Sequence, residues 1–313
     1  MTALRPTPVR PAPPGTTARP VIRARGVTMA YGDVDVLHGI DLDIHQGEVF
    51  ALLGPNGAGK TTTVEILEGF RRRSSGEVSV LGADPERGDD AWRGRIGLVL
   101  QSWRDHRRWR VAELLTHFAT YYPDPRDPAG LLDLVGLTGQ AGQQVDRLSG
   151  GQRRRLDVAL GIVGRPELLF LDEPTTGFDP EARHEFHLLV ERLAREEGVT
   201  VLLTTHDLVE AERLADRIAM LVGGRIRACG TPAELARRAA AQAEVRWTDD
   251  DGTSRRERTE DPSRLVWELH QDAAGPIAGL EVRRPTLEDT YLHMVHREDG
   301  GAGESVAGEA RAV

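Results

Sequence analysis

The sequence is short of the features that mark a membrane pore, a secreted scaffold or a zinc protein. Its one cysteine, Cys229, excludes a disulfide framework and a cysteine-based zinc site. No apolar run approaches the roughly 18 residues that a membrane helix needs. The longest runs, such as Val49–Leu53 and Leu168–Leu171, have the length of buried strands. Because the sequence also lacks an apolar signal segment, it favours a cytoplasmic location.

The charges exclude one class of protein and single out one residue. A formal net charge of −9 argues against a general nucleic-acid binder, so we expect no nucleic-acid partner. Only one of the 40 basic residues is a lysine, Lys60, and the arginine excess is typical of a GC-rich bacterial genome. Lysine offers a compact point charge where arginine offers a planar fork. Lys60 therefore indicates a site that needs the point charge.

The pattern along the chain predicts two folded regions between two tails. Residues 1–20 are rich in proline and arginine, which predicts a disordered tail. Residues 21–230 alternate short apolar strands with helices, which predicts a mostly parallel sheet wrapped by helices, with a helical subdomain at about 102–164. Residues 231–297 predict a small α+β domain, and the Gly-, Ala- and Glu-rich residues 298–313 predict a second disordered tail.

Individual elements can be placed from apolar runs and turn residues. The strands predicted before residue 210 are Val27–Tyr31, Val36–Ile44, Glu48–Leu53, Glu77–Leu81, Ile96–Leu100, Glu167–Leu171 and Thr200–Thr204. Gly223-Gly224 predicts a hairpin between Ile218–Leu221 and Arg225–Cys229. The later elements are helices at Pro232–Ala241 and Ser263–His270, strands at Ala243–Trp247, Arg255–Thr259 and Leu280–Arg283, and a helix from Thr286 with Asp289 as its capping partner.

A glycine-rich turn between a predicted strand and a predicted helix carries the first chemical signal. The run Gly54-Pro55-Asn56-Gly57-Ala58-Gly59-Lys60-Thr61 fits the phosphate-loop pattern, in which backbone N–H groups converge on phosphate oxygens. The helix that follows adds its positive N-terminal end. We expect Lys60 to reach the β- and γ-phosphates and the Thr61 hydroxyl to bind Mg²⁺. A glycine-rich turn with a chance lysine is the alternative, which this context disfavours.

Two further motifs fit the same chemistry. The apolar run Leu168–Leu171 ends in Asp172 and Glu173, at the end of a parallel strand, where ligands bind. Asp172 can hold Mg²⁺ and Glu173 can deprotonate the attacking water. The run Leu148-Ser149-Gly150-Gly151-Gln152 precedes a helix and forms a second anion cradle. A simple Ser N-cap would explain Ser149 but not both glycines, and one nucleotide cannot use two cradles of one subunit.

In this order the three motifs resemble those of ATP-binding subunits of ABC transporters, and the resemblance covers residues 21–230. It assigns Gln101 to sensing Mg²⁺ and the attacking water, and His206 to contacting the γ-phosphate. It places Asp179, in Gly177-Phe178-Asp179, at the dimer interface, although Phe178 stands where the family usually has leucine. Tyr31 sits where the family stacks an aromatic ring on adenine.

The resemblance implies an α/β P-loop NTPase fold of the ABC type, with a helical subdomain and a small C-terminal α+β appendage. It implies an ATPase that uses ATP and Mg²⁺, and a homodimer in which Ser149–Gln152 of one subunit faces the phosphate loop of the other. This arrangement accounts for the two cradles. The catalytic residues it implies are Glu173, His206, Gln101 and Lys60, and the metal-binding residues are Thr61, Gln101 and Asp172. The nucleotide-binding residues it implies are Tyr31, Gly54, Pro55, Asn56, Gly57, Ala58, Gly59, Lys60, Thr61, Thr62, Ser149, Gly150, Gly151, Gln152 and Asp179.

The C-terminal region narrows the type of transporter. Pro285-Thr286-Leu287-Glu288-Asp289 resembles the ending of ATPases similar to the daunorubicin/doxorubicin-resistance exporters, which pair with a separate ABC-2 type permease. The resemblance thus implies an exporter subunit, peripheral on the inner face of the cell membrane. An importer ATPase shares every catalytic motif and remains an alternative, as does a soluble ABC ATPase without a transport role.

The segment Ser102–Arg110 holds four arginines and two tryptophans, Trp103 and Trp109. A solvated basic loop would explain the arginines but not the neighbouring tryptophans, because large aromatic side chains favour burial. In ABC ATPases the region after the glutamine corresponding to Gln101 receives the permease. Because Trp and Arg are enriched at binding hot spots, we predict that this segment docks the permease.

Overall fold

The computed structural model describes residues 20–99, 106–239, 243–249, 252–272, 275–283, 286–289 and 291. Apart from Pro20, both predicted tails lie outside the described residues, as do Gln101 and Trp103. Within the described ranges, no helix combines the length and the apolar character required to cross a bilayer.

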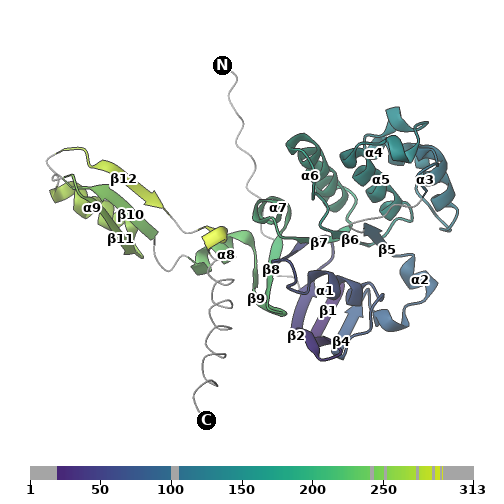
Figure 1. The fold of residues 1–313 in the computed structure, drawn as a ribbon, viewed down its shortest axis with the longest axis horizontal. Helices are drawn as coiled ribbons and strands as arrows, with labels where there is room; N and C mark the ends of the chain where they lie inside the picture. Colours follow the sequence, from purple (N-terminus) through teal and green to yellow (C-terminus); the bar gives the residue numbers. More distant parts are fainter. Residues whose placement is uncertain are drawn as a thin grey trace, which may run out of the picture.

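A six-stranded sheet lies at the centre of residues 21–230 (Figure 1). Its order is β5-β6-β7-β3-β8-β9, and all neighbours are parallel except the β8–β9 hairpin. The strands are β3 Val49–Leu53, β5 Ile96–Val99, β6 Leu168–Asp172, β7 Thr200–Thr205, β8 Arg217–Val222 and β9 Arg225–Gly230. Strands β3, β6 and β7 are buried throughout, as parallel strands covered on both faces must be. The predicted mostly parallel sheet and the hairpin at Gly223-Gly224 are confirmed.

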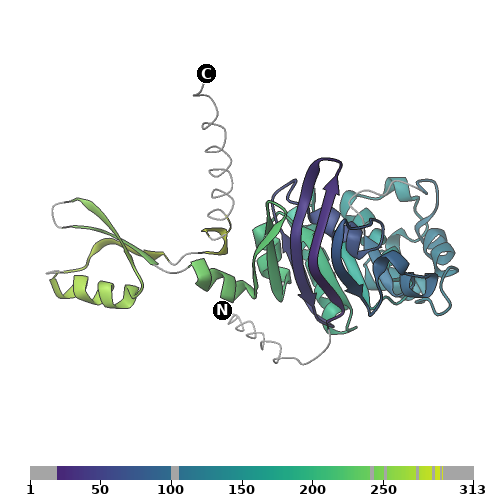
Figure 2. The same ribbon diagram turned by 90° about the horizontal axis from the view of Figure 1, so that it is seen from below.

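A separate antiparallel sheet, which the sequence does not predict, covers one face of the central sheet (Figure 2). It contains β1 Ile22–Tyr31, β2 Val34–Ile44 and β4 Ser75–Val80 in the order β2-β1-β4. The turn at Gly32-Asp33 joins β1 to β2, but β1 pairs with β4 across a long stretch of chain, which local patterns do not encode. Helix α1, Lys60–Leu67, packs between the two sheets, and its Val64 and Leu67 join the same buried cluster as Phe50 and Leu52 of β3.

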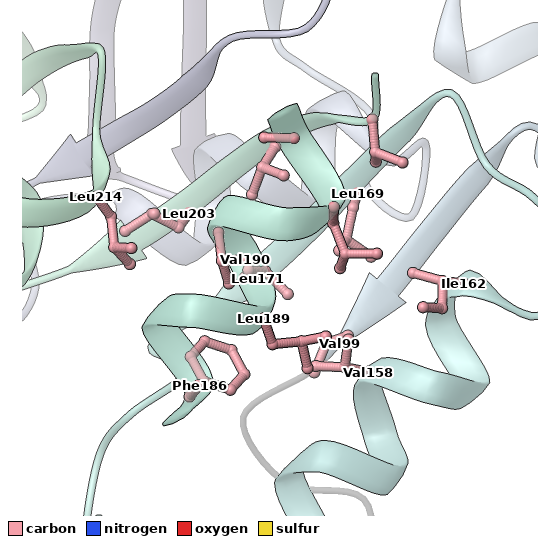
Figure 3. Packing of buried hydrophobic residues seen from close by; sticks show 14 of the residues in the cluster. Val99, Val158, Ile162, Leu169, Leu171, Phe186, Leu189, Val190, Leu203 and Leu214 are labelled. Carbon is pink, nitrogen blue, oxygen red and sulfur yellow. The ribbon is translucent and has the colours of Figure 1, made fainter. Parts of the chain in front are cut away.

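Three helices cover the opposite face of the central sheet. They are α5 Gly150–Ile162, α6 Pro180–Arg195 and α7 Leu208–Leu214. Phe186, Leu189 and Val190 of α6 point toward Leu171 and its neighbours on the strands (Figure 3). Full burial of one such side chain stabilises the fold by about 1.5–3 kcal/mol. This packing fixes the strand ends that carry the predicted site.

Helices α3 Val111–Ala119 and α4 Pro128–Leu134 pack against α5 on one side of the molecule (Figure 1). Helix α4 begins where the sequence chemistry indicates, because Asp127 caps it and Pro128 occupies its first turn. The remaining short elements of this part are α2 Asp90–Arg93 and 3₁₀ turns at Pro85–Arg87, Thr138–Gln140 and Val145–Arg147.

The C-terminal part contains a third sheet. Helix α8, Pro232–Ala239, leads to β10 Ala243–Thr248, β11 Ser254–Thr259, α9 Pro262–Asp272 and β12 Ala278–Arg283. The sheet order is β11-β10-β12, and α9 packs against β10 (Figures 1 and 2). The helices and strands predicted between Pro232 and Arg283 are present, with ends that differ by a few residues. Of the helix predicted from Thr286, the structure describes residues 286–289 and 291, and residues 287–289 are helical.

The chain then returns to the core of the preceding region. Leu287 is fully buried and belongs to the same apolar cluster as Leu235 of α8 and Ala228 of β9. Thr286 N donates to Asp289 Oδ2 at 2.9 Å and Asp289 N donates to Thr286 Oγ1 at 3.2 Å. The predicted capping pair is therefore confirmed.

Candidate functional site

The phosphate-loop sequence forms a tight turn between β3 and α1. Gly59 caps α1 with φ of 101°, and Gly57 has φ of 79°, a backbone region that favours glycine. A Cβ at Gly54 would lie 2.3 Å from Leu221 O, and one at Gly59 would lie 2.6 Å from Leu37 Cδ2. The turn can therefore take this shape only with glycine at positions 54 and 59. It leaves the N-terminus of α1 directed at the loop, as an anion site requires.

Lys60 is the first residue of α1, and only 6% of its surface is exposed. Its Nζ donates to Gly54 O at 2.9 Å and to Pro55 O at 3.1 Å. The same Nζ lies 3.4 Å from Glu173 Oε1, so the phosphate loop and the end of β6 meet at this ammonium group. The neighbouring Thr61 is exposed, which leaves its hydroxyl accessible to a ligand.

The two predicted carboxylates lie where β6 ends, beside β7. Asp172 Oδ1 accepts a hydrogen bond from Thr204 Oγ1 at 2.5 Å, and Glu173 N donates to Thr204 O and Thr204 Oγ1 at 3.2 and 3.0 Å. Glu173 Oε1 lies 3.4 Å from His206 Nδ1, the same distance as from Lys60 Nζ. Three residues that are far apart in the sequence, Lys60, Glu173 and His206, therefore meet around one carboxylate.

The backbone of Glu173 has φ of 42°, in the left-handed region that residues other than glycine seldom adopt. Such a conformation costs about 1–3 kcal/mol and persists only where its surroundings enforce it. Here Thr204 holds the amide, and the side chain of Glu173 is 14% exposed at the meeting point with Lys60. The turn directs the carboxylate away from the strand and toward the phosphate loop.

Asp172 and Thr61 could hold a magnesium ion. Mg²⁺ usually takes one or two carboxylates together with substrate phosphates and water, and one carboxylate with one hydroxyl fits that pattern. Among the described residues there is no group of three or more His, Cys, Asp or Glu side chains that would hold a metal without a substrate. The third predicted metal ligand, Gln101, lies outside the described residues.

The second predicted anion-binding site is the N-terminus of helix α5. Ser149 caps α5, with Gln152 N donating to Ser149 Oγ at 3.2 Å and Ser149 N donating to Gln152 Oε1 at 3.0 Å. Ser149 and Gly150 are exposed, and nothing lies within 4 Å of a Cβ built on Gly150. In the described part of the chain, the side-chain hydrogen bonds of Ser149 and Gln152 join these two residues to each other and not to the phosphate loop.

Two other predicted nucleotide-binding residues, Asp179 and Tyr31, lie at the start of α6 and at the end of β1. Asp179 caps α6, where its Oδ1 accepts from Ala182 N at 2.8 Å. Tyr31 ends β1 and is 41% exposed, with its hydroxyl 3.3 Å from Thr62 Oγ1. The guanidinium of Arg71 lies over the Tyr31 ring, 4.8 Å from its centroid.

Sequence reasoning missed three residues of the site. Thr204 could have been found, because it is a polar residue at the end of the buried strand β7. Arg154 of α5 donates to the backbone beside Glu173, which no local pattern indicates. Burial, reinforced by Asp172 and Glu65, raises the pKa of Glu68 at the end of α1 to about 8, and the sequence gives no signal of that burial.

A family profile described as ABC transporter matches residues 37–176. The Nod factor export ATP-binding protein I of Cupriavidus pinatubonensis is 38% identical, over 93% of this chain and 95% of the relative. A fluoroquinolones export ATP-binding protein of Mycobacterium tuberculosis is also 38% identical, over 74% of this chain and 78% of the relative.

Solved structures with similar folds cover about two thirds of the chain. A structure titled as the ATP-binding subunit of an ABC transporter has a TM-score of 0.61 and 27% identity, over 69% of this chain and 92% of that one. The dimeric structure of MJ0796, a bacterial ABC transporter cassette, has a TM-score of 0.60 and 25% identity, over 67% of this chain and 98% of that one.

Proposed function

Because the chain belongs to the ABC transporter family, as an ATP-binding subunit with ATPase activity, we propose that it hydrolyses ATP to drive export through a separate membrane permease. The observation that carries the proposal is the meeting of Lys60 and His206 at one oxygen of Glu173, beside the glycine turn. The export role is supported by the relatives named for Nod factor and fluoroquinolone export.

The residues divide the work of phosphoryl transfer, which needs positioning and charge neutralisation more than covalent help. The loop Gly54–Lys60 holds the phosphates by backbone N–H groups, and the Lys60 ammonium neutralises the β- and γ-oxygens. Glu173 takes the proton of the attacking water, and His206 fixes Glu173 and contacts the γ-phosphate. Mg²⁺ bound by Thr61, Asp172 and Gln101 would add further charge neutralisation.

The remaining proposed contacts complete the nucleotide site. Tyr31 stacks on the adenine, and its exposed ring at the end of β1 supports this role. Ser149–Gln152 binds the nucleotide held by a second copy of the chain, with Asp179 at the interface. The exposed, unobstructed start of α5 supports this homodimer, as does the similarity to a cassette whose structure is dimeric.

We propose that the permease is of the ABC-2 type and docks near Trp109. This tryptophan is 36% exposed and lies in a cluster of rings, 4.9 Å from His117 and 5.7 Å from His106 between centroids. An exposed aromatic cluster of this kind suits a protein partner. Docking would place the subunit on the inner face of the membrane. Trp103, the other predicted anchor, lies outside the described residues.

The proposed domain division is an ATPase domain at 21–230 and an α+β domain at 231–297. The separate β11-β10-β12 sheet supports it, and so does the packing of α3 and α4 on α5 for a helical subdomain at about 102–164. The Thr286–Asp289 capping pair is compatible with the exporter-type ending of the sequence.

The test of the proposal is Glu173→Gln, with Glu181→Gln on the exposed first turn of α6 as its control. Loss of a general base should lower turnover by about 10²- to 10⁴-fold. ATP with Mg²⁺ should then hold Glu173→Gln as a dimer in size-exclusion chromatography, while Glu181→Gln keeps wild-type turnover. A monomeric Glu173→Gln, or one with normal turnover, would contradict the proposed site.

A second measurement tests the partner. The full chain is expressed with and without a permease of the ABC-2 type, and its distribution between membrane and supernatant is measured. We expect more of the chain in the membrane fraction when the permease is present. The same membrane fraction with and without the permease would refute this partner.

A further inference from the structure

One arginine of the α5 helix reaches the strand end that carries the proposed base. Arg154 lies two residues beyond Gln152 and is 7% exposed. Its Nη2 donates to Asp172 O at 2.7 Å and its Nε donates to Pro174 O at 3.1 Å. These carbonyls belong to the residues immediately before and after Glu173. One side chain therefore holds the backbone on both sides of the base.

The hydrogen bonds of Arg154 flank a residue with a strained backbone. Glu173 has φ of 42°, and a conformation of this kind needs external support. Thr204 supports the amide of Glu173 from β7, and Arg154 supports the two flanking carbonyls from α5. A planar guanidinium with donors in a fixed fork can bridge two carbonyls at once, which a single ammonium does less well.

Burial lowers the pKa of Arg154, although a guanidinium remains charged at neutral pH. The acids Asp157, Asp172 and Glu210 act in the opposite direction to burial. Glu210 of α7 is 2% exposed and accepts a hydrogen bond from Thr175 Oγ1 at 2.7 Å, so it holds the next residues of the same loop. The loop after β6 is thus attached to α5 by Arg154 and to α7 by Glu210.

We propose that Arg154 is a positioning residue, which holds Glu173 in its working orientation and links that orientation to the Ser149–Gln152 end of α5. The inference rests on the proposed role of Glu173 as the base. Ser149–Gln152 faces the nucleotide of the partner subunit in the proposed dimer, whereas Glu173 serves the nucleotide of its own subunit. If binding of the partner's nucleotide at Ser149–Gln152 displaces α5, Arg154 would therefore transmit that displacement to Glu173, which serves the nucleotide of its own subunit.

The experiment compares Arg154→Met and Arg154→Lys with a matched control, Arg155→Met. Arg155 follows on the same helix and pairs with Glu185 at 3.3 Å, away from the strand end. Misplacement of a reacting group can cost about 10²-fold. We expect Arg154→Met to lower kcat by about that factor with KM for ATP within about twofold of wild type, Arg154→Lys to lie between, and Arg155→Met to keep wild-type kcat.

A double variant shows whether Arg154 acts through Glu173. If it does, Arg154→Met should cause no further loss of single-turnover rate in the Glu173→Gln background, because effects of residues that act as a unit do not add. Circular dichroism checks the fold of each variant. If Arg154→Met does not fold, Arg154→Lys carries the same comparison, alone and with Glu173→Gln.

The outcomes separate this inference from the proposed function. Normal kcat in a folded Arg154→Met or Arg154→Lys would overturn the positioning role, as would an additive loss in the double variant. If Glu173→Gln itself keeps normal turnover, the proposed role of Glu173 fails and the positioning role fails with it. If Glu173→Gln loses turnover while the folded Arg154 variants keep it, only the inference about Arg154 is refuted.

Discussion

Replacing Glu68 with glutamine should make the protein more stable at neutral and alkaline pH. Glu68 is the C-cap of α1 and has 9% of its surface exposed, and burial raises its pKa from the ordinary value of 4.5 to about 8. Asp172 and Glu65 act in the same direction. The folded protein therefore keeps a proton on Glu68 that the unfolded chain loses. Glutamine has nearly the shape of that protonated acid and cannot ionise.

The size of the effect follows from the two pKa values. Between pH 4.5 and pH 8 the folded state binds the extra proton, so the free energy of unfolding falls as pH rises and levels off above pH 8. At about 1.4 kcal/mol per unit, the loss is ~3 kcal/mol at pH 7 and ~5 kcal/mol at pH 9. Glu68→Gln removes this loss and should match the wild type near pH 5.

Urea unfolding at pH 5, 7 and 9 measures the difference, with Glu181→Gln as the control. Glu181 lies on the first turn of α6 and is exposed. The pKa of Asp157, which burial raises to about 6, contributes the same slope to both proteins and cancels in the difference. A Glu68→Gln variant whose advantage does not grow with pH would show that Glu68 is not held protonated.

Three further substitutions test other parts of the site. Lys60→Arg should lose most ATPase activity in a steady-state assay, because the planar fork does not fit a cradle around a point charge, and near-wild-type activity would refute this. Gly54→Ala puts a Cβ 2.3 Å from Leu221 O, which should lower ATP affinity in a titration and cost about 1–3 kcal/mol of stability. The control Gly139→Ala, where a Cβ meets nothing within 4 Å, should leave ATP affinity unchanged. An unchanged ATP affinity in Gly54→Ala would refute this prediction. Trp109→Ala should weaken permease co-purification by about 2 kcal/mol, unlike the exposed Trp267→Ala, and equal recovery of the permease would exclude Trp109 as an anchor.

The core of the site could be predicted because it follows from local sequence and one topological rule. The glycine turn, strand β3 and helix α1 are contiguous in the chain. Glu173 and His206 follow β6 and β7, and because parallel neighbours end at the same edge of a sheet, they come together there. The contacts of Lys60 with Glu173 add atomic detail to an arrangement that the motif order already indicates.

The parts that could not be predicted depend on contacts between distant residues. Strand β1 pairs with β4 rather than only with its hairpin partner, and nothing in either strand specifies that pairing. The sequence Gln152-Arg153-Arg154-Arg155 contains three successive arginines, of which Arg154 alone is buried. Which of them faces the strand end is decided by the rotation of α5 on the sheet. The burial of Glu68 depends in the same way on how α1 seats between two sheets.

The return of Leu287 to the core defines the β10–β12 sheet as an excursion of the chain. The polypeptide leaves the body at α8, forms the third sheet with α9, and comes back to an apolar cluster that includes Leu235 of α8 itself. For such a closed loop the entropic cost of joining the ends grows only with the logarithm of its length. Insertions with neighbouring ends can be lengthened, shortened or exchanged without altering the strand order of the host. A change in the length of this excursion therefore adds little to the entropic cost of joining its ends, and it leaves the phosphate loop and its carboxylates in place.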